Sequence, residues 1–282
     1  MGIGTYFTIF DVSILFMHRT FCFRLLLGVL LPLLPLRGFS WGLTGHRVVG
    51  EIASQHLSPQ ARKAIRALLG RESLAMIANW PDFIKSDTTR RYDHTSRWHY
   101  LDFPAGATAE EFDNILKKAK GENLYTQTQA MIRQLKSATA TKEQQIFALK
   151  FLVHMIGDMH QPLHVGRDED QGGNKVSVYW FDRPTNLHRV WDEQLVEFQQ
   201  LSYTEYAKAL DIVPASTVSK LQGGSIRDWM FESHVLADKI YARTKEGDKL
   251  SYRYNYLFQE DLNRQLLKGG LRLAKILNDI YK

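Results

Sequence analysis

The stretch FLVHMIGDMHQPLH, residues 151–164, decides the fold that we expect. It is largely apolar, and it carries His154 and, four residues later, Asp158. Residues four apart project from one face of an α-helix with Cβ atoms about 5–6 Å apart, so this pair can bind one cation. The stretch NLHRVWD repeats the spacing with His188 and Asp192. Two such pairs predict a helical metalloenzyme with more than one metal ion.

Pro162 divides the first stretch into two parts. If one helix ran unbroken from His154 to His164, the two side chains would lie about 15 Å apart along its axis, too far to share an ion. Pro162 instead predicts that the helix ends near Gln161. His164 then fits better with the second His/Asp pair, and the three side chains make a ligand set typical of catalytic zinc sites.

The first His/Asp pair needs other ligands, and the upstream sequence offers three. They are Asp82 in NWPDF, His99 in RWHYLD and His46 in WGLTGHR. Each alone is weak evidence for a metal site, because a single Asp is most often a cap or a surface charge and a single His is most often structural. Together with the two pairs and His164 they could form two or three zinc sites. The remaining histidines of residues 41–282 lack an equally good partner and are expected to be structural or to support the ligands; they are His56, His94, His160 and His234.

Residues 1–40 are expected to be a secretory signal peptide. Two arginines precede the apolar run LLLGVLLPLLPL, and the small residues Gly38 and Ser40 stand at positions minus three and minus one before Trp41. The alternative, a membrane anchor, is disfavoured because the run has about 12 residues where a span needs about 20. Met17 is an alternative start of translation.

Residues 41–282 are expected to form one domain, because no Gly/Ser-rich or Pro-rich linker divides them. The only cysteine, Cys22, falls in the leader, so the core or bound metals must stabilise the mature chain. The net charge of the full chain is +6. Such a modest positive balance favours polyanions only weakly.

Capping residues mark several helix starts in this domain. Ser58 and Pro59 suit the N-cap and first turn of a helix, and Gly70 suits its C-cap. Only NKVSVYWF, residues 174–181, alternates like a strand, and RPTN after it is expected to be the turn of a hairpin that returns NLHRVWD to the helices. The expected fold class is therefore mainly α with a small β-hairpin. Other helical signals are the capping boxes Thr141 with Gln144 and Ser202 with Glu205, and the periodic residues 225–243 and 254–281.

The motifs, taken together, resemble the zinc-dependent single-strand nuclease family of the S1/P1 type. In order they are WGLTGHRVVGEIA, NWPDF, WHYLD, FLVHMIGDMHQPLH, GGNKVSVYW and NLHRVWD, and they extend from Trp41 to about Asp192. The helical remainder resembles the family more loosely. The resemblance implies a single-domain helical fold like that shared by zinc phospholipase C and the single-strand nucleases, with a small β-hairpin.

The resemblance also implies a site for three Zn²⁺ ions per chain. In that family the mature N-terminus is itself a ligand, so cleavage after Ser40 would free the α-amino group of Trp41 to bind metal. The alternative for Trp41 is an ordinary buried aromatic residue. Carried over by motif, the ligands would be Trp41, His46 and Asp158 at one zinc, Asp82, His99, His154 and the bridging Asp158 at the second, and His164, His188 and Asp192 at the third.

Asp82, Lys85, Asp158 and Asn174 would be the catalytic residues by this resemblance. Lys85 stands where the family has a basic residue near the scissile phosphate, usually Arg. Lysine lacks the bidentate fork of arginine, so a solvated surface lysine is the alternative. Asn174 would contact the phosphate or the attacking water, unless it only caps the strand.

Substrate choice would depend on two residues after His99. Tyr100 would stack on a base and Asp102 would hydrogen-bond the base edge, with Lys85 and Asn174 on the phosphate. Stacking on an aromatic side chain is sequence-tolerant but requires an unstacked base, which favours single strands.

The function implied is that of an exported, secreted or periplasmic, zinc-dependent nuclease. It would hydrolyse single-stranded RNA and DNA to 5′-phosphate products with a metal-bridged water as nucleophile, and would also act on 3′-nucleotides. We expect a monomer with no stable protein partner and no membrane anchor after leader cleavage. One alternative is a zinc-dependent phospholipase C, and another is a protein that binds zinc or nucleotides without turnover.

Overall fold

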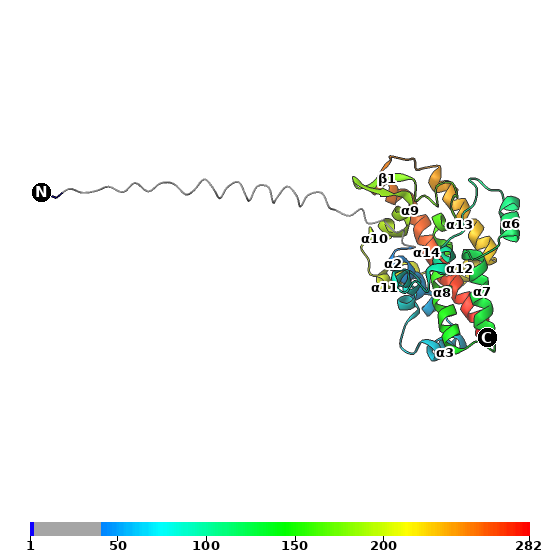
Figure 1. Cartoon of the computed structure of the whole chain (residues 1–282). Coiled ribbons are helices and arrows are strands. Elements are labelled where there is room, and N and C mark those ends of the chain that lie inside the picture. Colours follow the sequence, from blue (N-terminus) through cyan, green and yellow to red (C-terminus); the bar gives the residue numbers. More distant parts are fainter. Residues whose placement is uncertain (3–40) are drawn as a thin grey trace. The chain divides into compact units, whose positions relative to one another are not determined.

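The computed structural model describes residues 1–2 and 41–282. The chain divides into two units, and residues 41–282 belong to the second. Apart from its first two residues, the predicted signal peptide, including Cys22 and its cleavage site, lies outside the described residues. The described part of the second unit is mainly helical, as the sequence predicts (Figure 1). Among the described helices, none combines the length and apolar character needed to cross a membrane.

Helices of very different lengths make up this unit. Short 3₁₀ or π turns connect some of them and carry several residues of the candidate site. The longer helices are α2 (Leu43–Gln55), α3 (Pro59–Leu69), α6 (Ala109–Lys118), α7 (Leu124–Lys136), α8 (Lys142–His160), α11 (Tyr203–Leu210), α12 (Ala215–Leu221), α13 (Ile226–Tyr241) and α14 (Tyr252–Ile280). The shorter elements are α4 (Leu74–Ile77), α5 (Trp80–Phe83), η1 (Ile84–Ser86), η2 (Asp93–His99), η3 (Pro162–Val165), α9 (Leu187–Arg189), the π-helix η4 (Val190–Gln194) and α10 (Leu195–Glu197).

The central helix of the unit is α8. The capping box of Thr141 and Gln144 starts it, and it ends at His160, just before Pro162, as predicted. Every residue from Phe151 to His160 is buried, because α2, α5, α7, α13 and α14 all pack against this helix (Figure 1). A helix that is buried on all sides is expected to be apolar all round. The His and Asp side chains of α8 are therefore exceptions that need partners inside the protein.

Helix α14 lies against α2 along its glycine pair. A Cβ atom placed on Gly270 would lie 2.5 Å from the side chain of Ile52, and one on Gly269 would lie 3.1 Å from Val49. The absence of side chains at these positions lets the two helix backbones approach closely. Because α2 carries His46, this close packing helps to set the position of one candidate ligand.

The predicted caps are confirmed elsewhere in the unit. The Ser58 hydroxyl accepts a hydrogen bond from the Ala61 amide at 3.1 Å, and Gly70 ends α3 with a φ of 67°. Ser202 and Glu205 form the predicted capping box of α11. These signals are local, which explains why the sequence alone predicts them.

The small sheet has the strand order β2-β1-β3. Strand β1 (Ser177–Trp180) pairs antiparallel with β2 (Arg183–Asn186) and parallel with β3 (Lys249–Leu250). The predicted hairpin is confirmed, but the prediction that residues 183–186 are its turn is wrong. They form β2, where Pro184 is tolerated because the strand lies at the edge. The turn is the pair Phe181 and Asp182, whose φ angles of 47° and 62° give the tight two-residue connection typical of hairpins.

Candidate metal centre

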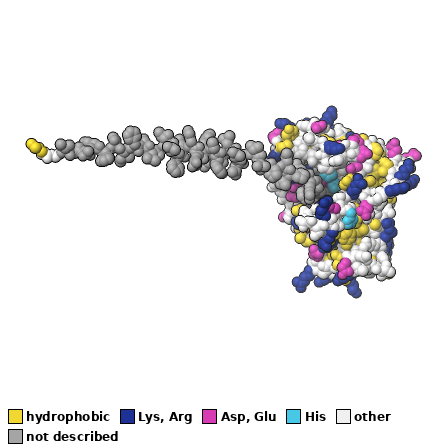
Figure 2. Space-filling model, in the orientation of Figure 1, with side chains coloured by type: hydrophobic (Ala, Val, Ile, Leu, Met, Phe, Trp, Pro, Cys, Tyr) yellow, Lys and Arg dark blue, Asp and Glu magenta, His cyan; other side chains and the backbone are white. Residues whose placement is uncertain are grey.

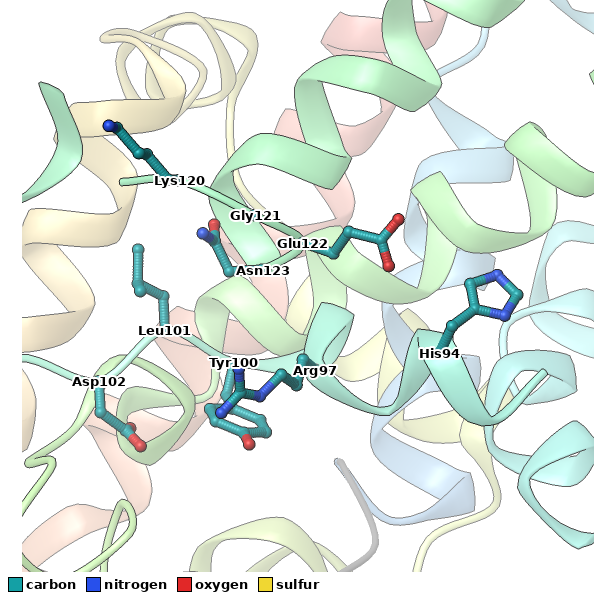
Figure 3. Close-up of a pocket in the computed structure, with 9 residues that line it drawn as sticks. All are labelled: His94, Arg97, Tyr100, Leu101, Asp102, Lys120, Gly121, Glu122 and Asn123. Carbon is teal, nitrogen blue, oxygen red and sulfur yellow. The ribbon is translucent and has the colours of Figure 1, made fainter. Parts of the chain in front are cut away.

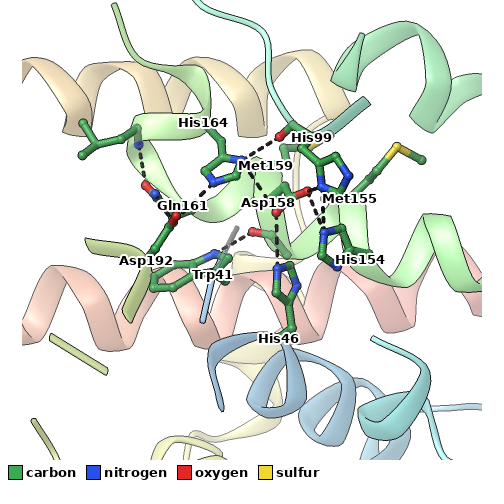
Figure 4. Close-up of polar contacts among 12 residues, drawn as sticks. Trp41, His46, His99, His154, Met155, Asp158, Met159, Gln161, His164 and Asp192 are labelled. Atoms are coloured by element: carbon green, nitrogen blue, oxygen red, sulfur yellow. Dashed lines mark hydrogen bonds and ion pairs between the residues drawn. The ribbon is translucent and has the colours of Figure 1, made fainter. Parts of the chain in front are cut away.

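Histidine and aspartate side chains from separate segments meet around the C-terminal half of α8 (Figure 4). Helix α8 supplies two of them and is the element against which the others are placed. All are buried, although charged and polar groups are seldom buried without partners. They are His46 from α2, Asp82 from α5, His99 from η2, His154 and Asp158 from α8, His164 from η3, His188 from α9 and Asp192 from η4.

Asp158 lies in the middle of the cluster (Figure 4). Its Oδ1 atom is 3.3 Å from His46 Nε2, and its Oδ2 atom is 3.1 Å from His99 Nδ1 and 3.2 Å from His154 Nε2. His164 Nδ1 is 3.6 Å from Oδ1. One carboxylate therefore faces histidines from four elements, which is the position that a bridging ligand requires.

Two candidate ion sites share His154. One comprises His46, Asp82 and His154, and the other comprises His99, His154 and Asp158. In each, the ligand atoms lie within 4.8 Å of one another. The rings of His46 and His154 stack at 3.9 Å, so the two sites are adjacent.

A third candidate site contains His164, His188 and Asp192, the set predicted from the spacing and from Pro162. His164 Nε2 is 3.3 Å from Asp192 Oδ1, and His188 Nε2 is 3.0 Å from Asp192 Oδ2. The pair on NLHRVWD is carried by a short α turn followed by a π turn, rather than by one regular helix. The structure nevertheless brings all three side chains together.

Backbone carbonyls fix the orientation of three of the histidine rings. The Nδ1 atoms of His154, His164 and His188 lie 2.6–2.7 Å from the carbonyl oxygens of Ala78, His99 and Gly172, respectively. A carbonyl can only accept, so each Nδ1 must carry a proton and donate it. The Nε2 atom of each neutral ring is then left as an acceptor, as a metal ligand must be.

The site also contains buried polar atoms that form no hydrogen bond within the described part of the chain. They include His164 Nε2 and Asp192 Oδ2. A buried polar atom without a hydrogen bond costs about 1–3 kcal/mol. Bound metal ions would supply the missing partners of these atoms. Imidazole with carboxylate is a ligand set that suits zinc. The three groups therefore suit zinc, although His46 lies with Asp82 and His154 in the first group and not with Asp158 as predicted.

The electrostatics of the metal-free protein favour cation binding. Burial would raise the pKa of Asp158, but His154 and His164 hold that pKa well below its usual range. Burial would lower the pKa of His164, but Asp158 and Asp192 raise it to about 9. Burial lowers the pKa of His99 to about 4. The central carboxylates are therefore ionised at neutral pH, and metal binding would displace the proton of His164.

Trp41 is buried beside this cluster. Its indole Nε1 donates to the carbonyl oxygen of Gly157 at 2.7 Å, one residue before Asp158 in the chain (Figure 4). The next residue, Gly42, donates its amide proton to the carbonyl oxygen of Asp192. Two segments that carry candidate ligands thus hold the start of the helical unit in place.

Lys85 and Asn174 have different surroundings. Lys85 Nζ donates to Asp82 Oδ1 at 2.7 Å, so this lysine contacts a candidate metal ligand and is more than a solvated surface charge. Asn174 Nδ2 donates to the carbonyl oxygen of Gln171 at 2.9 Å. The Asn174 side chain therefore stabilises its own turn in this structure.

Tyr100 and Asp102 line one cavity of about 470 Å³ beside the metal centre (Figure 3). The Tyr100 side chain is exposed, so its ring is accessible to a base. Asp102 is partly buried, its Oδ1 forms no hydrogen bond within the described residues, and burial raises its pKa to about 7. The two residues predicted to hold a base thus share one concave surface.

The other histidines that the structure describes lie outside the candidate ligand groups. His160 is buried on α8 and donates from Nδ1 to Ile156, while Nε2 faces Arg272 at 3.1 Å. His56 contacts Asp211 at 2.8 Å, and His234 Nδ1 lies 2.9 Å from the carbonyl oxygen of Val165. His94 is exposed and packs its ring on Trp98.

Sequence reasoning missed two residues that support the ligands. A Cβ atom on Gly157 would lie 2.5 Å from His46 Nδ1, so only glycine leaves room for that imidazole. A glycine inside a strongly helical run costs about 1 kcal/mol, which is a signal that could have identified it. Gln161 Nε2 donates to Asp192 Oδ1, and Gln161 Oε1 accepts from the Leu163 amide at 2.6 Å. Nothing in the sequence around Gln161 indicates this role.

Comparison with known proteins agrees with this geometry. The family model described as S1/P1 Nuclease matches residues 41–282. The chain is 28% identical to Endonuclease 2 of Arabidopsis thaliana over 267 residues, covering 86% of this chain and 90% of that protein. It is 31% identical to Endonuclease 3 of the same plant over 265 residues, covering 86% and 89%. It is 28% identical to Nuclease P1 of Penicillium citrinum over 274 residues, covering 86% and 98%. These matches span the helical unit that contains the candidate site.

Proposed function

Because the chain belongs to the S1/P1 nuclease family of phosphodiesterases, we propose that it hydrolyses single-stranded RNA and DNA to 5′-phosphate products and also acts on 3′-nucleotides. The observation that carries this proposal is the position of Asp158. Its two oxygens lie 3.1–3.3 Å from nitrogen atoms of His46, His99 and His154. A phosphodiester is a poor electrophile, and a cluster of cations is one established way to lower its barrier to hydrolysis.

The three candidate groups would hold three zinc ions. Asp158, which belongs to the second group and lies 3.3 Å from His46 of the first, would bridge two of these ions. Bound zinc would supply the activated water and the charge stabilisation that phosphodiester hydrolysis needs. The protein's own contribution is to hold the ligands. Carbonyl groups orient the rings of His154, His164 and His188, and Gln161 orients the Asp192 carboxylate. Lys85 would place a positive charge beside Asp82 near the scissile phosphate.

The α-amino group of Trp41 would complete the zinc site that contains His46 and Asp158. Support comes from the placement of Trp41, whose indole is hydrogen-bonded to Gly157 beside Asp158. The proposal requires cleavage after Ser40, and with it export to a periplasm or to the medium. One extra residue before Trp41 should then remove a ligand and lower the zinc content. Full zinc content and activity in that variant would show that the amino group is not a ligand.

Single-strand selectivity would come from Tyr100 and Asp102. An exposed tyrosine ring can stack on any base with a gain of about 1–3 kcal/mol, but only if that base has left its duplex stack. The Asp102 carboxyl group, which lines the same cavity, would hydrogen-bond the base edge. Asn174 would contact the phosphate after releasing Gln171.

The experiment compares three substrates with the zinc-loaded protein: single-stranded RNA, the same RNA in a duplex, and phosphatidylcholine. We expect acid-soluble 5′-phosphate nucleotides from the single strand, a much lower rate on the duplex, and no release of phosphocholine. Faster hydrolysis of phosphatidylcholine would instead support a zinc-dependent phospholipase C. Zinc binding without release of nucleotides would support a protein that only binds zinc or nucleotides.

A further inference from the structure

The cavity beside Tyr100 extends beyond the residues predicted to hold a base. One wall is formed by η2 and the residues after it, from His94 to Asp102, and the other by the segment Lys120–Asn123 (Figure 3). Its volume is about 470 Å³. Arg97 and Lys120 both line it, and neither has a role in the metal centre. The question is what these two cations could bind.

Both walls of the cavity are held in place by the protein. The Leu124 amide donates to the Tyr100 carbonyl oxygen at 3.2 Å and so ties one wall to the other. Thr126 Oγ1 donates to the Gly121 carbonyl oxygen at 2.8 Å, and the Thr126 amide donates to Asn123 Oδ1 at 3.0 Å. A ligand would therefore meet a surface that is already formed, which lowers the entropy lost on binding.

The cavity lining carries two cations, Arg97 and Lys120, and two carboxyl groups, Asp102 and Glu122. Arg97 and Lys120 are exposed, and within the described residues neither forms an ion pair. The carboxylate of Glu122, which lies on the same wall as Lys120, accepts a hydrogen bond from Trp98 Nε1 at 3.1 Å. In Figure 3 the side chains of Arg97 and Tyr100 extend to the same side of the chain, whereas Lys120 lies on the other wall. An arginine that lines the same cavity as an aromatic ring suits a phosphate that is attached to a stacked nucleoside.

The direction of the bound strand follows from the proposed function. A 3′-nucleotide must place its 3′-phosphate at the metal centre while its base stacks on Tyr100. The only remaining point at which that nucleotide can continue into a longer strand is its 5′ oxygen. The part of the cavity that the base does not occupy is therefore available to a phosphate on the 5′ side.

We propose that Arg97, with Lys120 on the opposite wall, forms a subsite for the phosphate on the 5′ side of the nucleotide that stacks on Tyr100. This inference rests on the proposed nuclease function and deepens it. The subsite would make a nucleotide with a 5′-phosphate, or an oligonucleotide, a better substrate than a bare 3′-nucleotide. Arg97 would thus be a specificity residue that binds substrate without touching the reacting atoms.

The test compares adenosine 3′-phosphate with adenosine 3′,5′-bisphosphate, using release of the 3′-phosphate by the zinc-loaded protein. We expect a kcat/KM about 10-fold higher for the bisphosphate at low salt, and a preference that weakens as salt rises. Arg97→Ala should bring the ratio of the two kcat/KM values close to one, and Lys120→Ala should lower it in part. Arg97→Lys keeps the charge and should retain part of the preference.

Two controls make the ratio interpretable. Arg133 is an exposed arginine of α7 that does not line the cavity, and Lys118 is an exposed lysine two residues before Lys120 that also lies outside it. Arg133→Ala and Lys118→Ala should leave the ratio unchanged. If the wild-type protein hydrolyses both nucleotides equally well, or if Arg97→Ala keeps the wild-type ratio, the subsite is refuted while the nuclease function stands. If neither the nucleotides nor single-stranded RNA is hydrolysed, both proposals fail.

Discussion

Gly157 faces His46 so closely that a Cβ atom at position 157 would lie 2.5 Å from His46 Nδ1. The two residues come from α8 and α2, which are far apart in the sequence. The missing side chain lets the His46 imidazole stack on His154 at 3.9 Å and reach Asp158 Oδ1. One glycine thus determines whether the histidine of α2 can join the ligands of α8.

Gly157→Ala should therefore lower zinc content by about one ion per chain and reduce the rate on single-stranded RNA strongly. Alanine raises intrinsic helix stability by about 1 kcal/mol relative to glycine. We therefore expect the loss of zinc to come from displacement of the His46 ring and not from a weaker α8. Zinc analysis together with the helical circular dichroism signal checks this. A variant with wild-type zinc content and activity would show that the close approach to His46 is not needed.

Asp158 and Asp192 should differ when each is removed. Asp158 belongs to one candidate group and lies 3.3 Å from His46 of a second, whereas Asp192 belongs to the third alone. Asp158→Ala should therefore lose about two zinc ions per chain, and Asp192→Ala about one. Measured by metal analysis after dialysis, equal losses from the two variants would contradict the bridging role of Asp158.

Tyr241 should support the third site from a distance. Its hydroxyl donates to Asp170 Oδ1 at 2.8 Å, and the same atom accepts from the Gly173 amide at 2.7 Å. This holds the segment whose Gly172 carbonyl orients His188. Tyr241→Phe should cost about 1 kcal/mol of stability and weaken zinc binding at the third site about 10-fold.

The control for this prediction is Tyr206→Phe. Tyr206 is a buried tyrosine whose hydroxyl donates to Asn263 at 2.6 Å, away from the candidate ligands. It should lose similar stability without a change in zinc affinity. Chelator competition measures that affinity, and an equal effect of the two substitutions on it would refute the role of Tyr241.

Glu232 should make stability depend on acid pH. Its Oε2 atom lies 2.8 Å from Lys268 Nζ and 2.8 Å from the guanidinium of Arg272, which is buried. Burial would raise the pKa of Glu232, but Lys268 and Arg272 hold it below 4.5. A lowered carboxyl pKa stabilises the fold above the unfolded-state value, and this stability is lost as the pH falls through the folded-state value.

Glu232→Gln should therefore lower the free energy of unfolding by about 1–2 kcal/mol at pH 7, allowing for solvent screening of this half-exposed group. The difference from wild type should shrink below pH 4.5. Urea unfolding of the metal-free proteins checks both points. Glu260→Gln removes an exposed pair with Arg264 on α14 and should change stability little at either pH. A Glu232→Gln effect that is the same at pH 7 and pH 3.5 would contradict the assigned pKa shift.

Local signals predict much of this fold. The capping boxes at Thr141 and Ser202, and the end of α8 before Pro162, depend on residues within a few positions of each other. The hairpin turn was misplaced because Phe181 and Asp182 adopt positive φ angles without the Asn-Gly signature that usually marks such a turn. The parallel pairing of β1 with β3 joins segments about 70 residues apart, which no local pattern reports.

The candidate site also combines residues that local sequence patterns predict with residues that only the packing of distant segments brings together. The third group could be predicted, because His188 and Asp192 are close in sequence and Pro162 turns His164 away from α8. The sequence offered His46, Asp82 and His99 as possible partners of the first pair, but their grouping around His154 depends on how α2, α5 and η2 pack. The supports at Gly157 and Gln161 depend on atomic contacts that exist only in the folded chain.

The most direct test of the account is the zinc content of the protein that begins at Trp41, measured together with its rate on single-stranded RNA. We predict three zinc ions per chain at full activity, with activity lost as the ions are removed and regained when zinc is added back. Full activity with fewer than three zinc ions per chain would contradict the assignment of the three ligand groups.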